Sequence, residues 1–267
     1  MAENLDLEQI RRYMNRDCKL FLFEKTDSTN DQAMLKVKQG NVLPLACFAE
    51  EQTQGRGRRG KVWLSPPCSS VYLSLAWQFD LSVNNLGALS LAMGVAVARM
   101  LRQTGLEKVG LKWPNDVLLD DKKIAGILIE ATQVKNQVTT AIIGVGLNFE
   151  LPVDSPEMPD QPWTDVISEL PVGRKPGRNE IAALLLKECM VVCEDFVQNQ
   201  SALMFEYQKY DICLQQQVNV YMEDAPSVQG VVVGFETNGE IRIRINNKEQ
   251  LFNSAYISLR KTGNANN

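Results

Sequence analysis

The sequence contains no histidine among its 267 residues. This absence excludes the Ser-His-Asp and Cys-His arrangements of nucleophilic enzymes, and it excludes every histidine-ligated zinc site. Any proton transfer must therefore use a carboxylate, lysine, tyrosine, water or the substrate itself. Chemistry that depends on charge neutralisation and positioning remains open to this chain.

Signals for secretion and for membrane insertion are also lacking. The N-terminal residues 1–9 are polar and acidic, unlike a signal peptide, and the longest apolar run, 86–98, is too short to cross a bilayer. The six cysteines form no Cys-x-x-Cys pair, so we expect reduced thiols, with Cys189 and Cys193 one turn apart in a packed helix. These features predict a soluble, cytoplasmic protein that does not bind membranes.

Cations concentrate in one stretch of an otherwise acidic chain. The net charge is −4, yet residues 55–61 read Gly-Arg-Gly-Arg-Arg-Gly-Lys. Glycine lets backbone N–H groups converge on one point, and arginine offers planar donors that suit carboxylate and phosphate. The stretch, which we call the Gly/Arg loop, predicts a site for a small-molecule anion.

The Gly/Arg loop has three alternative interpretations. A phosphate-binding P-loop would need Ser or Thr where Val62 stands, and no helix is expected to start there. A reader of the DNA minor groove is disfavoured by the acidic flank at Glu50 and Glu51 and by the net charge. A solvated basic loop is the third alternative.

Three further motifs place polar groups or glycines on expected strands. Residues 112–116 read Lys-Trp-Pro-Asn-Asp and present polar side chains at a strand end, although a structural Asx turn explains them equally well. Residues 122–126 open a strand with two lysines, for which a surface hairpin with solvated lysines is the usual interpretation. Gly126 within that strand indicates close approach of a ligand or backbone. Gly144 and Gly146 share one strand face and would leave a slot for a flat ring, or mark a bulge.

The apolar periodicity predicts an α+β fold, in which a mixed β-sheet carries helices packed on it. Adjacent β segments that lack a helix between them argue against a doubly wound Rossmann topology. We expect helices over 5–16, 27–39, 84–103, 179–198 and 201–213, and strands over 19–24, 45–50, 71–79, 108–112, 117–119, 124–132 and 138–149. Residues 151–177 are expected to be mostly loop.

From residue 217 onward the pattern changes to short β segments. We expect strands over 218–222, 228–236, 239–245 and 249–257, with Asn238-Gly239 as a hairpin turn. The expected organisation is a large α+β domain over 1–214, a small all-β domain over 215–262 and a disordered tail over 263–267.

Taken together and in order, the motifs resemble the biotin protein ligases (biotin–[acetyl-CoA-carboxylase] ligases). The resemblance covers residues 5–260 and rests on Asp-Ser-Thr-Asn at 27–30, Gln52 with the Gly/Arg loop, Trp63-x-Ser-Pro, Lys-Trp-Pro-Asn-Asp at 112–116, Lys123-x-Ala-Gly and Gly-x-Gly-x-Asn at 144–148. It implies a class II aminoacyl-tRNA synthetase/biotin synthetase-like catalytic domain followed by an SH3-like domain. Because the Asp-Ser-Thr-Asn motif arrives by residue 27, it implies the ligase-only form, without a DNA-binding repressor domain.

The resemblance implies a reaction in two steps that uses biotin, ATP and Mg²⁺. The biotin carboxylate attacks the α-phosphorus of ATP to give biotinyl-5′-AMP and pyrophosphate, and a lysine of a biotin carboxyl carrier protein then attacks the acyl-adenylate. Two anions must meet in the first step, so fixed cations are the chemistry that this step needs. The implied partners are a carboxylase carrier domain and no nucleic acid, with the enzyme as a monomer or homodimer.

The resemblance also assigns residues to roles. Lys123, Arg58 and Asp116 are the implied catalytic residues, with Asp116 orienting or deprotonating the incoming lysine. The implied biotin contacts are Ser28, Thr29, Gln52, Gly55, Arg56, Arg58, Trp63, Lys123, Gly126, Leu128, Gly144 and Gly146. The implied nucleotide contacts are Arg58, Arg59, Lys112, Asn115, Lys123, Asn148 and Trp163. The Gly/Arg loop is expected to close over the adenylate, which water would otherwise hydrolyse.

Lipoate- or octanoate-transferring enzymes are the nearest alternative, because they are thought to share the fold. Those families usually carry a motif that contains histidine, and this chain has none. A nucleic-acid-binding regulator that uses Arg56 to Arg59 and an adenylate-binding module without catalysis are two further alternatives.

Overall fold

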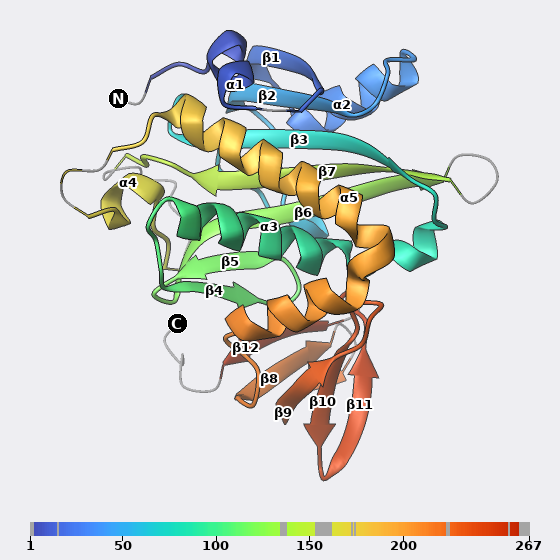
Figure 1. Cartoon of the computed structure of the whole chain (residues 1–267). Helices are drawn as coiled ribbons and strands as arrows, with labels where there is room; N and C mark the ends of the chain where they lie inside the picture. Colours follow the sequence, from blue (N-terminus) through green and yellow to red (C-terminus); the bar gives the residue numbers. More distant parts are fainter. Residues whose placement is uncertain are drawn as a thin grey trace.

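A seven-stranded mixed sheet forms the centre of the molecule (Figure 1). The computed structural model describes residues 3–14, 16–133, 138–152, 162–171, 173, 175–222, 225–255 and 257–261. In spatial order the strands are β1 (Lys19–Thr26), β2 (Leu45–Gln52), β3 (Ser70–Phe79), β7 (Thr139–Asn148), β6 (Lys122–Gln133), β5 (Asp116–Leu119) and β4 (Val109–Lys112). Only β1 and β2 run parallel among these neighbours, so the predicted mixed sheet is confirmed.

Helices cover the two faces of this sheet unequally. On one face, α3 (Leu89–Gln103) and α5 (Arg178–Tyr210) enclose the main hydrophobic core, and they cross in front of the strands in Figure 1. On the opposite face, α2 (Thr29–Lys38) packs on a small core formed by Ala33, Leu45, Cys47, Ala76 and Ile142. The rest of that second face is left to the Gly/Arg loop and to the candidate site.

Helix α3 is the most apolar helix that the structure describes. By length and composition alone, Val83–Gln103 is long and apolar enough to cross a membrane. The apolar run of 86–98 counted from the sequence therefore underestimated the length of this apolar segment. Most of this segment is buried between the sheet and α5, which is the environment of a core helix. A short 3₁₀ turn, η2 (Val83–Leu86), precedes α3.

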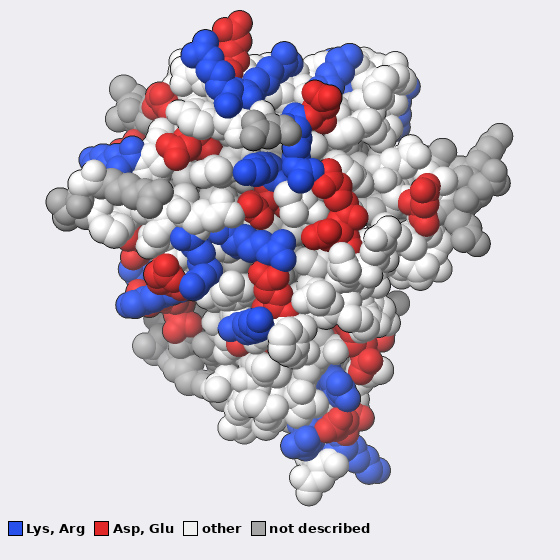
Figure 2. Space-filling view, viewed as in Figure 1, with Lys and Arg blue, Asp and Glu red and all other residues white. Residues whose placement is uncertain are grey.

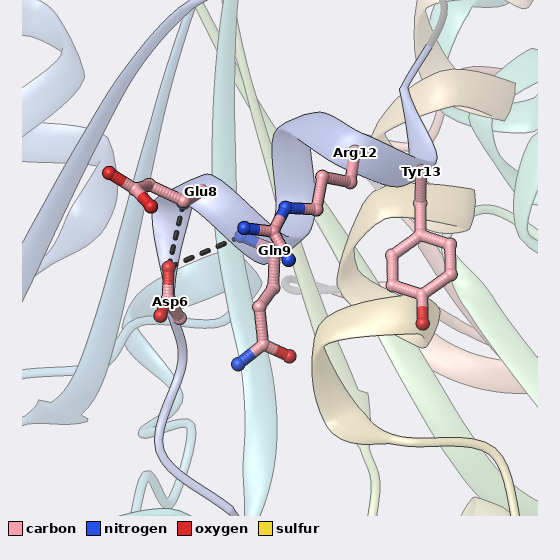
Figure 3. A pocket seen from close by; sticks show the side chains of 5 residues that line it. All are labelled: Asp6, Glu8, Gln9, Arg12 and Tyr13. Atoms are coloured by element: carbon pink, nitrogen blue, oxygen red, sulfur yellow. Dashed lines mark hydrogen bonds between the residues drawn. The ribbon is translucent and has the colours of Figure 1, made fainter.

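Helix α1 (Leu7–Tyr13) begins at a side-chain cap, which Figure 3 shows. The Asp6 carboxylate accepts hydrogen bonds from the backbone N–H groups of Glu8 at 2.7 Å and Gln9 at 3.2 Å. These bonds lower the pKa of Asp6, because they favour its charged form. A surface hollow beside the cap is lined by residues of this segment and includes no residue singled out from the sequence.

The chain ends in a second, five-stranded antiparallel sheet. In spatial order it consists of β11 (Lys248–Phe252), β10 (Ile241–Ile245), β9 (Ala225–Phe235), β8 (Gln217–Met222) and β12 (Ile257–Lys261). The Asn238-Gly239 turn joins β9 to β10 as predicted, with Gly239 at φ +85°. The domain boundary at 214/215 stays a prediction, and the predicted tail lies outside the described residues.

The break expected between the helices over 179–198 and 201–213 is confirmed, because the backbone of α5 is not helical at Asn199, with φ −122° and ψ 26°. Two other predicted elements differ from the structure. The strand expected over 249–257 is divided by a turn, because the Asn253 side chain accepts a hydrogen bond from the Ala255 N–H at 2.9 Å. The loop expected over 151–177 includes a short helix, α4 (Val166–Glu169), which the Asp165 side chain caps; residues 153–161, 172 and 174 of it lie outside the described part.

The two sheets are joined by contacts at β4 and at the hairpin turn. The backbone N–H of Ile212 donates to the carbonyl of Leu111 at 3.0 Å, and the Trp113 indole donates to the carbonyl of Gly239 at 3.1 Å. A Cβ atom at Gly239 would lie 2.8 Å from the Cα of Ala88, so only glycine allows this turn to pack so closely. The second sheet is therefore held in one position against the main sheet.

Charges of both signs are interspersed on the face of the molecule that Figure 2 shows. Arg, Lys, Asp and Glu side chains alternate there over the helices and over the second sheet. An interspersed surface of this kind produces no extended field of one sign.

A buried ion pair ties the N-terminal segment to the sheet. Arg178, which is fully buried at the start of α5, pairs with Glu50 of β2 and donates to the carbonyl of Ser70 at 2.7 and 3.0 Å. The other oxygen of Glu50 accepts the Leu5 N–H at 2.6 Å. Removing one partner would leave the other charge buried and uncompensated.

We expect Arg178→Met to lower the free energy of unfolding by about 3–5 kcal/mol, because it leaves the Glu50 carboxylate unpaired. Urea denaturation, with midpoints and slopes fitted together, measures the change. As a control, Arg16→Met removes a more exposed pair with Glu194 and should cost less than about 1 kcal/mol. Adding Glu50→Gln to Arg178→Met should recover part of the loss, and equal stability of wild type and Arg178→Met would contradict the assignment.

Candidate functional site

The candidate site follows one row of residues across the main sheet. The strand register pairs Tyr72 with Gly146, Gly146 with Gly126, Gly126 with Asp116 and Asp116 with Lys112. Paired residues of neighbouring antiparallel strands point to the same face. The register therefore brings together glycines and charged groups that are far apart in the sequence.

The two glycines of this row are covered by an indole ring. A Cβ atom at Gly146 would lie 2.5 Å from the Trp63 ring, and one at Gly126 would lie 2.8 Å from it. The flat ring that lies against the glycine face is therefore Trp63 itself. Its ring nitrogen is buried and has no hydrogen-bond partner within the described parts of the chain.

Lys123 lies between this indole and a carboxylate. Its Nζ is 5.3 Å from the centroid of the Trp63 ring and 2.6 Å from Oδ1 of Asp116. Both side chains of the ion pair are mostly shielded from solvent, with 17% and 22% exposed. Two of the three predicted catalytic residues are thus in direct contact.

The backbone of Lys123 is fixed by the segment that carries Trp163. The Lys123 N–H donates to the carbonyl of Pro162 at 2.9 Å, and the Lys123 carbonyl accepts the Thr164 N–H at 3.0 Å. The Asn148 amide donates to the carbonyls of Lys123 at 3.3 Å and Thr164 at 2.9 Å. Asn148 therefore joins the end of β7 to both segments.

The Gly/Arg loop is a hairpin. Trp63 N–H donates to the carbonyl of Gly55 at 2.9 Å, and Gly57 N–H donates to that of Lys61 at 2.7 Å. A 3₁₀ turn, η1 (Arg58–Gly60), forms the tip. No helix follows the loop, which agrees with the prediction that it is not a P-loop.

The three arginines of the loop have different partners. Arg56 forms a bidentate pair with Asp31, at 2.6 and 2.7 Å, and lies 3.5 Å from Glu130. The hydrogen bonds with Arg56 lower the pKa of Asp31. Arg58 and Arg59 reach the second sheet, and burial together with the charge of Arg59 lowers the pKa of Arg58. Asp116 acts on Arg58 in the opposite sense, so the two groups lie within electrostatic range.

The start of α2 forms the opposite end of the site. The side-chain oxygen of Gln52, Oε1, accepts hydrogen bonds from the backbone N–H of Thr29 at 2.8 Å and from the Thr29 hydroxyl at 3.1 Å. The side-chain amide nitrogen of Gln52 donates to the Ser65 hydroxyl at 3.0 Å. Ser28 is buried, caps the helix without a side-chain hydrogen bond and makes no hydroxyl bond to another described residue. Its hydroxyl is thus available to a ligand.

Gly55 and Gly144 permit close packing here. A Cβ atom at Gly55 would lie 2.4 Å from the carbonyl oxygen of Trp63. One at Gly144 would lie 2.5 Å from the side-chain oxygen of Asn30, so Gly144 makes room for α2. Leu128, paired with Gly144 in the register, is half-buried on the same face.

The Lys-Trp-Pro-Asn-Asp motif is fastened on several sides. The Asn115 amide donates to the carbonyl of Ile127 at 3.0 Å, and Ser90 of α3 donates to that of Pro114 at 2.9 Å. Lys112 is opposite Asp116 in the register and is half-buried. None of these described contacts is the Asx turn of the alternative interpretation, and the motif presents Asp116 to Lys123.

Sequence reasoning missed four members of this region. Asp31 and Glu130 hold Arg56, and Ser74 donates to Thr29 at 2.7 Å and to Asn30 at 2.6 Å. Glu130 was detectable, because it follows Gly126 and Leu128 at strand spacing on the same face. The fourth, Ser254, acts through its backbone carbonyl, which no side-chain pattern reveals.

The arrangement can hold an apolar ring system with an anion at one end. Trp63, the glycine row and Leu128 supply flat apolar surface, the start of α2 supplies hydrogen bonds, and Lys123 and Arg58 supply positive charge. No cluster of three or more potential metal-binding Cys, Asp or Glu side chains occurs in the described ranges.

Comparisons with known proteins agree with this geometry. Residues 22–148 match the Biotin/lipoate A/B protein ligase family. The chain is 32% identical to the bifunctional ligase/repressor BirA of Escherichia coli strain K12, over 88% of this chain and 72% of the relative. It is 31% identical to a biotin–[acetyl-CoA-carboxylase] ligase of Mycobacterium tuberculosis, over 81% of this chain and 80% of the relative.

The fold is similar to that of a solved ligase. The structure of the Aquifex aeolicus biotin protein ligase in complex with biotin and ATP superposes with a TM-score of 0.75 and 26% identity, covering 91% of this chain and 99% of that one. Together with the two curated relatives, this similarity places the whole main sheet and the second sheet within one known architecture. The chain belongs to the Biotin/lipoate A/B protein ligase family and, within it, to the biotin protein ligases.

Proposed function

We propose that this protein is an ATP-dependent ligase that activates biotin as biotinyl-5′-AMP and transfers the biotinyl group to a specific lysine of a biotin carboxyl carrier protein. The observation that carries the proposal is the Lys123–Asp116 pair, which stands beside the glycine face covered by Trp63. The named relatives are biotin ligases, and the similar Aquifex structure contains biotin and ATP.

In the first step a carboxylate oxygen of biotin forms a bond to the α-phosphorus, and the bond to pyrophosphate breaks. Both reactants are anions, so the barrier falls when fixed cations hold them together. We assign this work to Lys123 and Arg58, whose positions are set by Asp116 and by the second sheet. Magnesium bound to the nucleotide would neutralise the leaving pyrophosphate.

In the second step the carrier lysine attacks the acyl carbon, and AMP leaves. The attacking ammonium must lose a proton, and Asp116 is the carboxylate that we assign to orient that lysine or to accept its proton. Because Asp116 is paired with Lys123, the same carboxylate links both steps. Closure of the Gly/Arg loop would keep water from the adenylate between them.

We propose the following roles for the remaining predicted contacts. Ser28, Thr29 and Gln52, at the start of α2, would bind the ureido head of biotin. Trp63, Gly126, Gly146 and Leu128 would contact its ring and chain, and Gly55 and Gly144 allow the close packing around them. Lys112, Asn115, Asn148, Trp163 and Arg59 would serve the nucleotide side, with Arg56 anchoring the loop through Asp31.

The name of the Mycobacterium relative indicates acetyl-CoA carboxylase as the source of the carrier domain, and we propose such a carboxylase as the partner. We further propose the cytoplasm as the compartment, where a biotin-dependent carboxylase, ATP and reduced thiols are available together. All six cysteines are free in the structure, which agrees with a reducing compartment.

Biotin-dependent exchange of labelled pyrophosphate into ATP tests the first step directly. We expect exchange with biotin and none above background with lipoate or octanoate at the same concentration, because the slot ends in groups suited to a ureido head. Exchange that depends on lipoate or octanoate and not on biotin would refute the assignment of substrate.

A matched pair of lysine variants tests the role of Lys123. We expect Lys123→Gln to lower kcat for pyrophosphate exchange by about 10²- to 10³-fold, since it removes a fixed charge aimed at the reacting phosphate. The neighbouring Lys122, which is 49% exposed and pairs with Glu169, gives the control. Lys122→Gln should change kcat less than twofold.

Circular dichroism should show that both lysine variants are folded at the assay temperature. A Lys123→Gln protein with kcat close to that of wild type would rule out the catalytic role. Equal losses in both variants would likewise show that position 123 has no special part in the reaction.

A further inference from the structure

The turn between β11 and β12, residues 253–255, contacts the tip of the Gly/Arg loop. The carbonyl of Ser254 accepts hydrogen bonds from Nη2 of Arg58 at 2.6 Å and from Nη2 of Arg59 at 3.3 Å. The carbonyl of Ala255 accepts a further bond from Arg59 at 3.0 Å. Two arginines of one predicted anion site are thus held by backbone groups nearly 200 residues away.

The conformation of the loop tip needs outside support. Arg59 has φ 55° and ψ 39°, the left-handed region, in which a side chain comes close to its own backbone and which few residues other than glycine adopt. Such residues persist where neighbouring contacts fix them. The carbonyls of the 253–255 turn supply those contacts at this residue and at the one before it.

The turn has its own internal support. The Asn253 side chain accepts the N–H of Ala255 at 2.9 Å, which sets the direction of the backbone between them. The sheet that carries the turn is fixed in turn at Gly239, against Trp113 and Ala88. The carbonyls of Ser254 and Ala255 are therefore presented at a defined place beside the main sheet.

Arg58 keeps most of its donors after this contact. A guanidinium group has five N–H donors, and the bond to Ser254 uses one of its nitrogens. Asp116 lies within electrostatic range of Arg58, and Asp116 contacts Lys123. The contact with Ser254 thus holds the Arg58 guanidinium without occupying all of its donors.

We propose that the turn Asn253–Ala255 is a positioning element of the active site, whose carbonyls hold Arg58 and Arg59 so that Arg58 meets the phosphates of ATP in a preset orientation. This inference rests on the proposed function. It assigns a part in nucleotide binding to a turn that contributes only backbone groups to the contact.

The variant Asn253→Ala tests the proposal, because it removes the bond that shapes the turn and leaves the carbonyls in the chain. We expect KM for ATP to rise about tenfold, the size of effect of weakening a hydrogen bond to a charged group. KM for biotin and kcat at saturating ATP should stay within about twofold of wild type. Hydrogen exchange of residues 56–62, measured without substrate, should become faster.

Two control variants distinguish a positioning role of Asn253 from a general loss of stability. Asn253→Ser retains a side-chain oxygen that can shape the turn, so it should recover most of the affinity for ATP. Gln250→Ala removes an exposed side-chain amide from β11 of the same sheet. It should leave both KM for ATP and the hydrogen exchange of residues 56–62 unchanged.

A double-mutant cycle with Arg58→Ala gives the decisive comparison. If the turn acts through Arg58, Asn253→Ala adds little to the KM for ATP of the Arg58→Ala enzyme. A wild-type KM for ATP in Asn253→Ala, or full additivity in the double variant, would overturn the proposal. Failure of the proposed function gives a different result. The wild-type enzyme would then show no biotin-dependent pyrophosphate exchange, while the rate of hydrogen exchange of residues 56–62 would still respond to Asn253→Ala.

Discussion

The absence of a Cβ atom at two paired positions is the constraint on which the site depends. Gly126 of β6 and Gly146 of β7 face each other in the register, and the Trp63 indole lies against both. Any larger residue at Gly146 would enter the ring, because its Cβ would lie 2.5 Å away. The indole carries the end of the Gly/Arg loop with it, so this contact sets how near the loop comes to Lys123.

Charge balance explains how so many cations stay together in an acidic protein before any substrate binds. Three cations of the site have an oxygen partner: Lys123 has Asp116, Arg56 has Asp31, and Arg58 has the carbonyl of Ser254. Fixed partners hold these side chains in place, so the site needs little reorganisation when an anion arrives. A carbonyl carries no net charge, so Arg58 keeps the positive charge that an anionic phosphate requires.

The sequence predicted most of the fold because its signals are local. Alternating or continuous apolar runs, glycines at turns and caps such as Ser28 identified the strands and helices of the main sheet within a few residues. The grouping of the motifs also followed from the residues, since the glycine pair and the Lys-Trp-Pro-Asn-Asp turn mark strand faces and ends. The split at Asn253 was not predicted, because it depends on one side-chain hydrogen bond, which Asn253 accepts from the N–H of Ala255.

The partners of the arginines were beyond prediction for a different reason. A run of Gly and Arg shows that an anion can be held, but it does not show which guanidinium is already engaged. Arg56 pairs with a helix residue, whereas Arg58 and Arg59 bond to backbone carbonyls that exist at every residue of every chain. Only the packing of the second sheet, fixed by Gly239 against Ala88 and by the Trp113 indole, selects which carbonyls they meet. The second sheet therefore contributes to the candidate site as well as to the fold, because Arg58 lies in a loop against the main sheet and bonds to a carbonyl of the second sheet's turn.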